Sequence, residues 1–161
     1  MPTLVQKFNP MRGKIVLLLL MMGTVVFMSC GKKSQKEIDD ELIVNYIAEN
    51  NLEAIKTDSG LYYQIIAEGN GVSPTMVDQV SVYYTGRLLN GKIFDHTQEG
   101  EPVVFSLGEV ILGWQEGLQL MHEGGQALLI VPSHLGYGNR PVGDIPANSV
   151  LVFTVELLNI E

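Results

Sequence analysis

The sequence predicts a two-layer α+β domain in which several antiparallel strands pack against one short helix. Two observations support this prediction. From Leu52 onward, short segments with apolar residues at alternate positions are separated by glycine-rich turn signals. Only one stretch of this region, around Trp114, has the spacing of a helical face. The predicted strands are residues 61–67, 79–88, 92–95, 103–107, 126–131 and 149–160.

The first 29 residues predict a signal peptide. Three basic residues precede an uncharged run, 15–28, which is short for a transmembrane span and typical of the core of a signal peptide. Cys30 follows this region and a small residue, an arrangement that resembles a bacterial lipobox. The resemblance implies cleavage before Cys30 and lipidation of its thiol and new amino terminus. The alternative is an uncleaved amino-terminal anchor with an unmodified Cys30.

The remainder of the chain is strongly acidic. From Cys30 onward it contains seven basic and 18 acidic residues, and this charge balance argues against nucleic acid as a partner. Cys30 is the only cysteine, so no intrachain disulfide can form. We expect residues 30–51 to hold the lipidated cysteine, a polar tether and a short helix, and residues 52–161 to form one folded domain. Gly31 after the cysteine favours outer-membrane sorting, so we expect a lipid-anchored protein of the bacterial cell envelope that faces the periplasm.

Residues 35–49 predict a short amphipathic helix. Ser34 and Glu37 have the spacing of a capping box, which marks a helix start. The apolar side of this helix holds Ile38, Leu42, Ile43, Tyr46 and Ile47. A helix of this length is only marginally stable alone. We therefore expect its apolar side to dock on its own domain or to pair with a second copy, giving a monomer or a helix-mediated dimer.

Residues 79–95 predict a hairpin that brings two aromatic side chains together. Tyr84 lies on the apolar parity of the first strand. The Asn-Gly pair at 90–91 signals a tight turn. A two-residue turn would point Phe94 outward, whereas a three-residue loop that ends in a left-handed glycine pairs Phe94 with Gly86. We choose the second register, which places Phe94 on the face of Tyr84.

The last predicted strand and the predicted helix around Trp114 indicate which faces form the core. The strand 149–160 carries a row of apolar residues on one parity: Leu151, Phe153, Val155 and Leu157. The helix carries one apolar face: Ile111, Trp114, Leu118 and Met121. Gly113 and Gly117 lie off that predicted face, where each should weaken the helix by about 1 kcal/mol relative to alanine.

The residue patterns of common catalytic and cofactor sites do not occur. No two histidines have zinc-ligand spacing, and no phosphate-binding loop or nucleophile motif is present, so we predict neither a metal nor a cofactor. Aromatic and aliphatic residues recur instead at positions where they could line a hollow. These residues are Tyr84, Phe94, Phe105, Val110, Ile111, Trp114, Tyr137, Ile145 and Phe153.

Several short motifs follow one another in a fixed order. They are Tyr84-Thr-Gly-Arg, Gly91-x-x-Phe94-Asp95, Val110-Ile111-x-Gly113-Trp114, Pro132-x-x-x-Gly136-Tyr137-Gly138 and Ile145-Pro146-x-Asn148. Over residues 54–161 the chain resembles the FKBP-type peptidyl-prolyl cis–trans isomerases, especially exported bacterial lipoprotein members. The resemblance implies a curved antiparallel sheet wrapped around one short helix, with a pocket between sheet and helix.

The resemblance also implies the roles of individual residues. Trp114 would form the pocket floor, and Tyr137 and Ile145 would lie on the loop that closes its mouth. The walls would be Tyr84, Phe94, Val110, Ile111 and Phe153, with Phe105 and Val103 as further substrate contacts. The backbone amide of Ile111 and the hydroxyl of Tyr137 would hold a substrate carbonyl. Asp95 matches a pocket carboxylate, for which we expect a tuning role and no proton transfer.

The implied activity is rotation of Xaa-Pro bonds in exported proteins, without a covalent intermediate. The chain departs from the family pattern at Val103, where an aromatic residue is common, and in residues 96–101, which lack an arginine. These departures make macrolide ligands weaker candidates than prolyl polypeptides. The alternative is a prolyl-peptide-binding chaperone or assembly module with little turnover.

Overall fold

The computed structural model describes residues 32–161, of which Lys33–Glu161 form one compact unit. The helices are α2 (Gln35–Glu49) and α3 (Leu112–Gln119), and the 3-10 helices are η1 (Leu107–Glu109) and η2 (Ser133–Leu135). The strands are β1 (Ile55–Lys56), β2 (Tyr62–Ala67), β3 (Gln79–Leu88), β4 (Ile93–His96), β5 (Val103–Ser106), β6 (Gln126–Val131) and β7 (Leu151–Ile160). The predicted signal peptide and the predicted lipidation of Cys30 lie outside the described residues.

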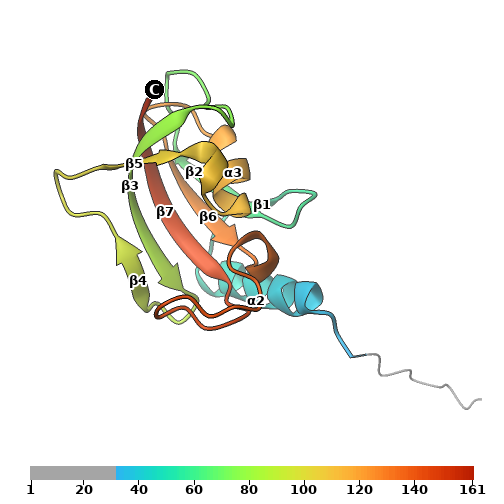
Figure 1. Cartoon of the computed structure of the whole chain (residues 1–161). Helices are drawn as coiled ribbons and strands as arrows, with labels where there is room; N and C mark the ends of the chain where they lie inside the picture. The colour runs from blue at the N-terminus through green and yellow to red at the C-terminus, as the bar shows by residue number, and fades with distance from the viewer. Residues whose placement is uncertain (1–31) are drawn as a thin grey trace, which may run out of the picture. The chain divides into compact units, whose positions relative to one another are not determined.

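All seven strands form one antiparallel sheet in the order β1-β2-β6-β7-β3-β4, and β5 pairs with β3 beside β4. The amino-terminal half of β3 pairs with β5 and its carboxy-terminal half with β4. Figure 1 shows β3 and β7 as long curved strands, with α3 packed beside the sheet. The predicted α+β class with a curved antiparallel sheet around one short helix is confirmed.

The main core lies between α3 and the sheet. The predicted parity of β7 is confirmed, because Leu151, Phe153, Val155 and Leu157 all belong to this core. Trp114 and Leu118 of α3 pack against them. The helix is shorter than its apolar spacing suggested, since Ile111 is its N-cap residue and Met121 lies beyond its end, although Met121 is fully buried.

The prediction that Gly113 and Gly117 lie off the packed face of the helix is wrong. Both glycines are buried and face β6. A Cβ on Gly113 would lie 2.5 Å from a methyl carbon of Val131, and one on Gly117 would lie 2.7 Å from a methyl carbon of Leu129. The glycines therefore let the backbone of α3 approach the sheet, and this close approach outweighs their low helix propensity.

A second, smaller core lies where α2 docks on the domain. The predicted capping box is present, since the Ser34 hydroxyl accepts from the Glu37 amide and the Glu37 carboxylate accepts from the Ser34 amide. Ile43 is fully buried against Ile130 and Val152, which lie on the opposite parity from the main core. No helix among residues 32–161 is long and apolar enough to cross a membrane.

Docking of α2 on its own domain, one of the two alternatives, is the arrangement in the structure. The predicted apolar side is only partly right, because Ile38 and Leu42 are 37% and 43% exposed. Asp39 is fully buried in their place. The rotation of the helix is set by hydrogen bonds to this carboxylate, which the spacing of apolar residues does not reveal.

Alanine substitutions at the two helix glycines should have different costs. We expect Gly113→Ala to lower the free energy of unfolding by about 1–3 kcal/mol, because the β-branched Val131 cannot rotate away from the new methyl group. Gly117→Ala should cost less, since the flexible end of Leu129 can move and alanine favours the helix by about 1 kcal/mol. Urea unfolding followed by Trp114 fluorescence measures both. Stabilisation by both substitutions would contradict the close packing.

Candidate active site

A cavity of about 210 Å³ lies between α3 and the sheet. It is lined by Tyr84, Phe105, Glu109, Val110, Ile111, Trp114, Tyr137 and Phe153. It reaches the protein surface, since Glu109 and Tyr137 on its border are exposed. Seven of the predicted site residues thus meet around one cavity. They come from β3, β5, β7, the start of α3 and the loop after η2: Tyr84, Phe105, Val110, Ile111, Trp114, Phe153 and Tyr137.

Trp114 lines this cavity and is surrounded by three other aromatic rings. Its ring centroid lies 5.1 Å from that of Tyr84, 5.6 Å from that of Phe105 and 5.3 Å from that of Phe153. All three pairs are edge-to-face, a favoured geometry that contributes about 0.5–1.5 kcal/mol per pair beyond burial. The indole is only 4% exposed, so it belongs to the core and to the cavity at once.

The hairpin β3–β4 differs from the predicted register by one residue. The turn is as predicted: the Leu88 amide donates to the Lys92 carbonyl, and Gly91 has a φ of +84°. The predicted pairing of Phe94 with Gly86 is wrong, because Gly86 pairs with Asp95 and the register shifts before Arg87. Phe94 is the extra residue of a β-bulge, a feature that local sequence does not specify.

The bulge turns two neighbouring side chains of β4 toward the same face. Phe94 packs on the main core with its ring 5.6 Å from that of Phe153. Asp95 accepts a hydrogen bond of 2.5 Å from the Tyr84 hydroxyl, although alternation along a regular strand would place it on the other face. The predicted proximity of Tyr84, Phe94 and Asp95 is therefore correct, for a reason different from the predicted register.

The tyrosine hydroxyls of the site are held in the protonated form. Burial, followed by the hydrogen bond to Asp95, raises the pKa of Tyr84 far above its ordinary value. Burial, followed by the negative charge of Asp95, raises the pKa of Tyr137. Both hydroxyls therefore keep their protons beyond the pH at which a free tyrosine titrates, and the proton of Tyr84 is donated to Asp95.

Four predicted site residues do not line the cavity. Phe94 packs against Phe153, and Asp95 accepts a hydrogen bond from Tyr84. Val103 is 38% exposed on β5, and Ile145 is 6% exposed within the main core. Sequence reasoning missed Glu109, the one charged residue among those that line the cavity. Its position directly before Val110 is the one signal in the sequence that could have indicated it.

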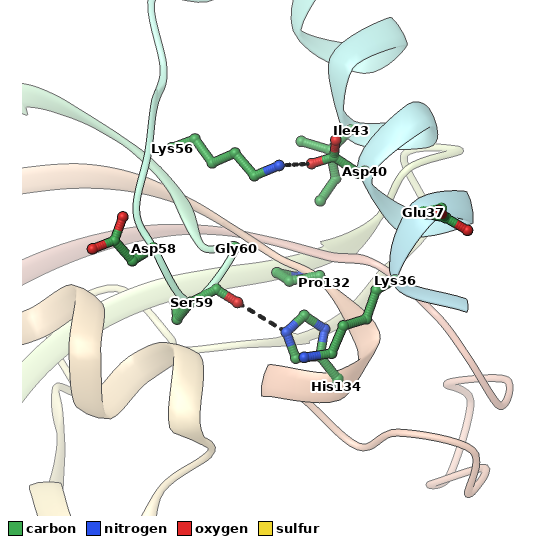
Figure 2. Close-up of a pocket in the computed structure, with 10 residues that line it drawn as sticks. All are labelled: Lys36, Glu37, Asp40, Ile43, Lys56, Asp58, Ser59, Gly60, Pro132 and His134. Carbon is green, nitrogen blue, oxygen red and sulfur yellow. Dashed lines mark hydrogen bonds and ion pairs between the residues drawn. The ribbon is translucent and has the colours of Figure 1, made fainter. Parts of the chain in front are cut away.

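A larger hollow of about 280 Å³ lies between α2 and the segments 56–60 and 132–134 (Figure 2). Its border carries charged side chains of both signs, with Lys56 paired to Asp40, and His134 lies within 3.0 Å of the Ser59 carbonyl oxygen. No aromatic ring other than that of His134 lines it. An apolar ring-shaped group such as a proline side chain fits the aromatic cavity better, so the latter is the candidate active site.

The fold and the site together define the class of protein. A short helix packs on a curved antiparallel sheet, and an aromatic cavity lies between them. Among residues 32–161, no group of side chains has the arrangement of a metal site. The family model described as FKBP-type peptidyl-prolyl cis-trans isomerase matches residues 71–158. The chain belongs to the FKBP-type peptidyl-prolyl cis-trans isomerase family.

Individual relatives support this assignment. The chain is 50% identical over 119 residues to the FKBP-type peptidyl-prolyl cis-trans isomerase FkpA of Aeromonas hydrophila, covering 72% of this chain and 44% of the relative. It is similar to the crystal structure of FkpA from Escherichia coli, with a TM-score of 0.70 and 37% identity over 79% of this chain and 63% of the other. A peptidyl-prolyl cis-trans isomerase structure from Pseudomonas syringae pv. tomato gives a TM-score of 0.67 and 31% identity, covering 81% of this chain and 99% of the other. The chain spans about half the length of the curated relatives it matches.

The raised tyrosine pKa values predict a loss of stability in alkali. An unfolded tyrosine loses its proton at about pH 10. Above that pH the unfolded state therefore loses protons that the folded state keeps, so the free energy of unfolding should fall as the pH rises. Urea unfolding at a series of pH values up to about 11 measures this fall. The double variant Tyr84→Phe/Tyr137→Phe should show a shallower fall, and parallel curves for the two proteins would contradict the assignment.

Proposed function

We propose that the chain is a peptidyl-prolyl cis–trans isomerase that accelerates rotation about Xaa-Pro bonds in exported proteins. One observation carries the proposal: an aromatic cavity that Trp114 lines has the tyrosine side chains of Tyr84 and Tyr137 around it. Membership of the family supports the same activity.

The reaction suits such a cavity because it makes and breaks no covalent bond. Rotation about a peptide bond disrupts amide resonance, at a barrier of roughly 18–20 kcal/mol. For Xaa-Pro the two isomers differ by only about 0.5–1 kcal/mol, and their exchange takes tens to hundreds of seconds. Amide resonance places negative charge on oxygen and positive charge on nitrogen, and water stabilises this separation. The twisted transition state has a smaller charge separation between oxygen and nitrogen. An apolar environment therefore favours the twisted state relative to the planar one.

Each part of the cavity has a place in this mechanism. The rings of Trp114, Tyr84 and Phe153 contact the proline ring through van der Waals packing and exclude water from it. Tyr137 and the amide of Ile111 orient the carbonyl group next to the proline nitrogen. Asp95 fixes the orientation of the Tyr84 hydroxyl and tunes the local potential. Every 1.4 kcal/mol by which these contacts favour the twisted state over the planar state gives a tenfold rate increase.

The activity can be tested with two adjacent tyrosines that lie on opposite faces of β3. Tyr84 lines the aromatic cavity, whereas Tyr83 does not. In a protease-free isomerisation assay on a Xaa-Pro tetrapeptide, Tyr84→Ala should lower kcat/KM about tenfold or more, because it removes a cavity wall. Tyr83→Ala should leave kcat/KM within about twofold.

Two results of this assay would change the proposal. Equal effects of the two substitutions would show that the activity does not depend on the aromatic cavity. Peptide binding to the unaltered protein with no gain in rate would instead favour the prolyl-peptide-binding module. Circular dichroism spectra of both variants verify that the fold is retained.

We also propose that the protein is anchored to the outer membrane of a bacterial cell through a lipid on Cys30. The support is the sequence pattern before this residue. Mass spectrometry of the protein purified from bacterial membranes should find an acylated amino-terminal Cys30. Cys30→Ala should yield protein without the lipid mass and outside the membrane fraction. An unmodified Cys30 preceded by the intact leader would contradict this proposal.

A further inference from the structure

Asp39 is the only charged residue with no solvent exposure in the described part of the chain. It lies on α2, and its Oδ2 accepts hydrogen bonds from the Ser133 amide at 2.8 Å and the Ser133 hydroxyl at 2.6 Å. Its Oδ1 accepts a hydrogen bond of 2.7 Å from Gln35 Nε2. Burial of a carboxylate is costly unless it is well hydrogen-bonded, so α2 can dock in this position only with Ser133 opposite Asp39.

Ser133 connects this carboxylate to the active site. It is the first residue of η2, in the segment that leads to Tyr137. Its carbonyl oxygen accepts hydrogen bonds from the amides of Gly136 at 3.0 Å and Gly138 at 2.8 Å. These two glycines flank Tyr137 on either side, so one carbonyl group holds both neighbours of a residue that lines the aromatic cavity.

The turn around Tyr137 needs such support. Glycine is the residue with the greatest backbone freedom, and Gly138 has a left-handed φ of +62°. Tyr137 itself is 38% exposed, so packing fixes it less firmly than it fixes Trp114. The position of Tyr137 therefore depends on backbone hydrogen bonds, among them those of its two flanking amides to Ser133.

We propose that Asp39 is a positioning residue for Tyr137: it holds Ser133, whose carbonyl group fixes the glycine-flanked turn that presents the tyrosine to the cavity. The N-terminal helix would thus act on the active site although none of its residues lines the aromatic cavity. This inference rests on the proposed function for its effect on turnover, and on the hydrogen bonds alone for its effect on the turn.

The same helix supplies a matched control. The next residue, Asp40, accepts hydrogen bonds from Lys56 and, at 2.7 Å, from the Tyr62 hydroxyl, and thus ties α2 to β1 and β2. Figure 2 shows Asp40 and Lys56 across the hollow from Pro132 and His134, the two neighbours of Ser133. Loss of Asp40 should loosen α2 without releasing Ser133.

The decisive experiment is a double-mutant cycle between Asp39→Ala and Tyr137→Phe, measured as kcat/KM on a Xaa-Pro tetrapeptide. In the parent protein, Asp39→Ala should lower kcat/KM about three- to tenfold, and in the Tyr137→Phe background less than about 1.5-fold. Asp39→Asn, which keeps an acceptor for Ser133, should recover most of the activity. Asp40→Ala should stay within about twofold of the parent. Ser133→Ala removes only one of the two bonds and provides the same cycle if Asp39→Ala does not fold.

A second measurement does not depend on activity. Amide hydrogen exchange at Gly138 should be about tenfold faster in Asp39→Ala than in the parent, and unchanged in Asp40→Ala. Equal effects of Asp39→Ala in both backgrounds, or unchanged exchange at Gly138, would overturn the proposal. If the parent protein fails to accelerate isomerisation, the proposed function is refuted, and the exchange rates still decide whether Asp39 positions the turn.

Discussion

The structure depends on how closely α3 approaches the sheet. Gly113 and Gly117 place the helix backbone against Val131 and Leu129 of β6, with no room for a side chain between them. This approach brings Trp114 into edge-to-face contact with rings of both β3 and β7. A helix held farther away would leave the indole without these neighbours, and the cavity above it would have no floor. Packing and site geometry are therefore set by the same contact.

A second constraint is the bulge in β4. An ordinary ladder would send Phe94 and Asp95 to opposite faces, so only one of them could serve the site. The extra residue lets Phe94 support Phe153 while Asp95 holds the Tyr84 hydroxyl. The missing side chain of Gly86 is part of this arrangement, since a Cβ there would lie 2.6 Å from the Phe94 ring.

Much of this architecture could be predicted from local patterns. The capping box at Ser34, the parity of β7 and the turn at Gly91 each depend on a few neighbouring residues, and each is confirmed. The features that could not be predicted depend on contacts between distant segments. Asp39 looks like a solvated residue on a helix, and only Ser133, far along the chain, accounts for its burial.

The same distinction applies to the site. The aromatic residues could be collected from the sequence because bulky rings at defined strand and helix positions gather in a core. Ile145 fits the pattern equally well but is buried in the main core, and Glu109 lines the cavity although its charge does not fit the aromatic pattern. A register shift of about one residue, or a different path of a loop, decides whether a side chain lines a cavity or is buried in the core. Hydrophobic spacing does not resolve differences of this size.

The proposed reaction needs no nucleophile, and it therefore places particular demands on the framework of the site. Its rate depends on holding a few donors at fixed places around a dry space, since no bond to the substrate corrects their positions. Trp114 and Phe153 meet this demand through core packing. Tyr137 lies in an exposed turn between glycines, so its position depends on backbone hydrogen bonds, two of which lead to Ser133 and from there to α2. The proposed role of Asp39 would make α2 a positioning element of the site, and changes in how α2 docks would then reach the cavity through Tyr137.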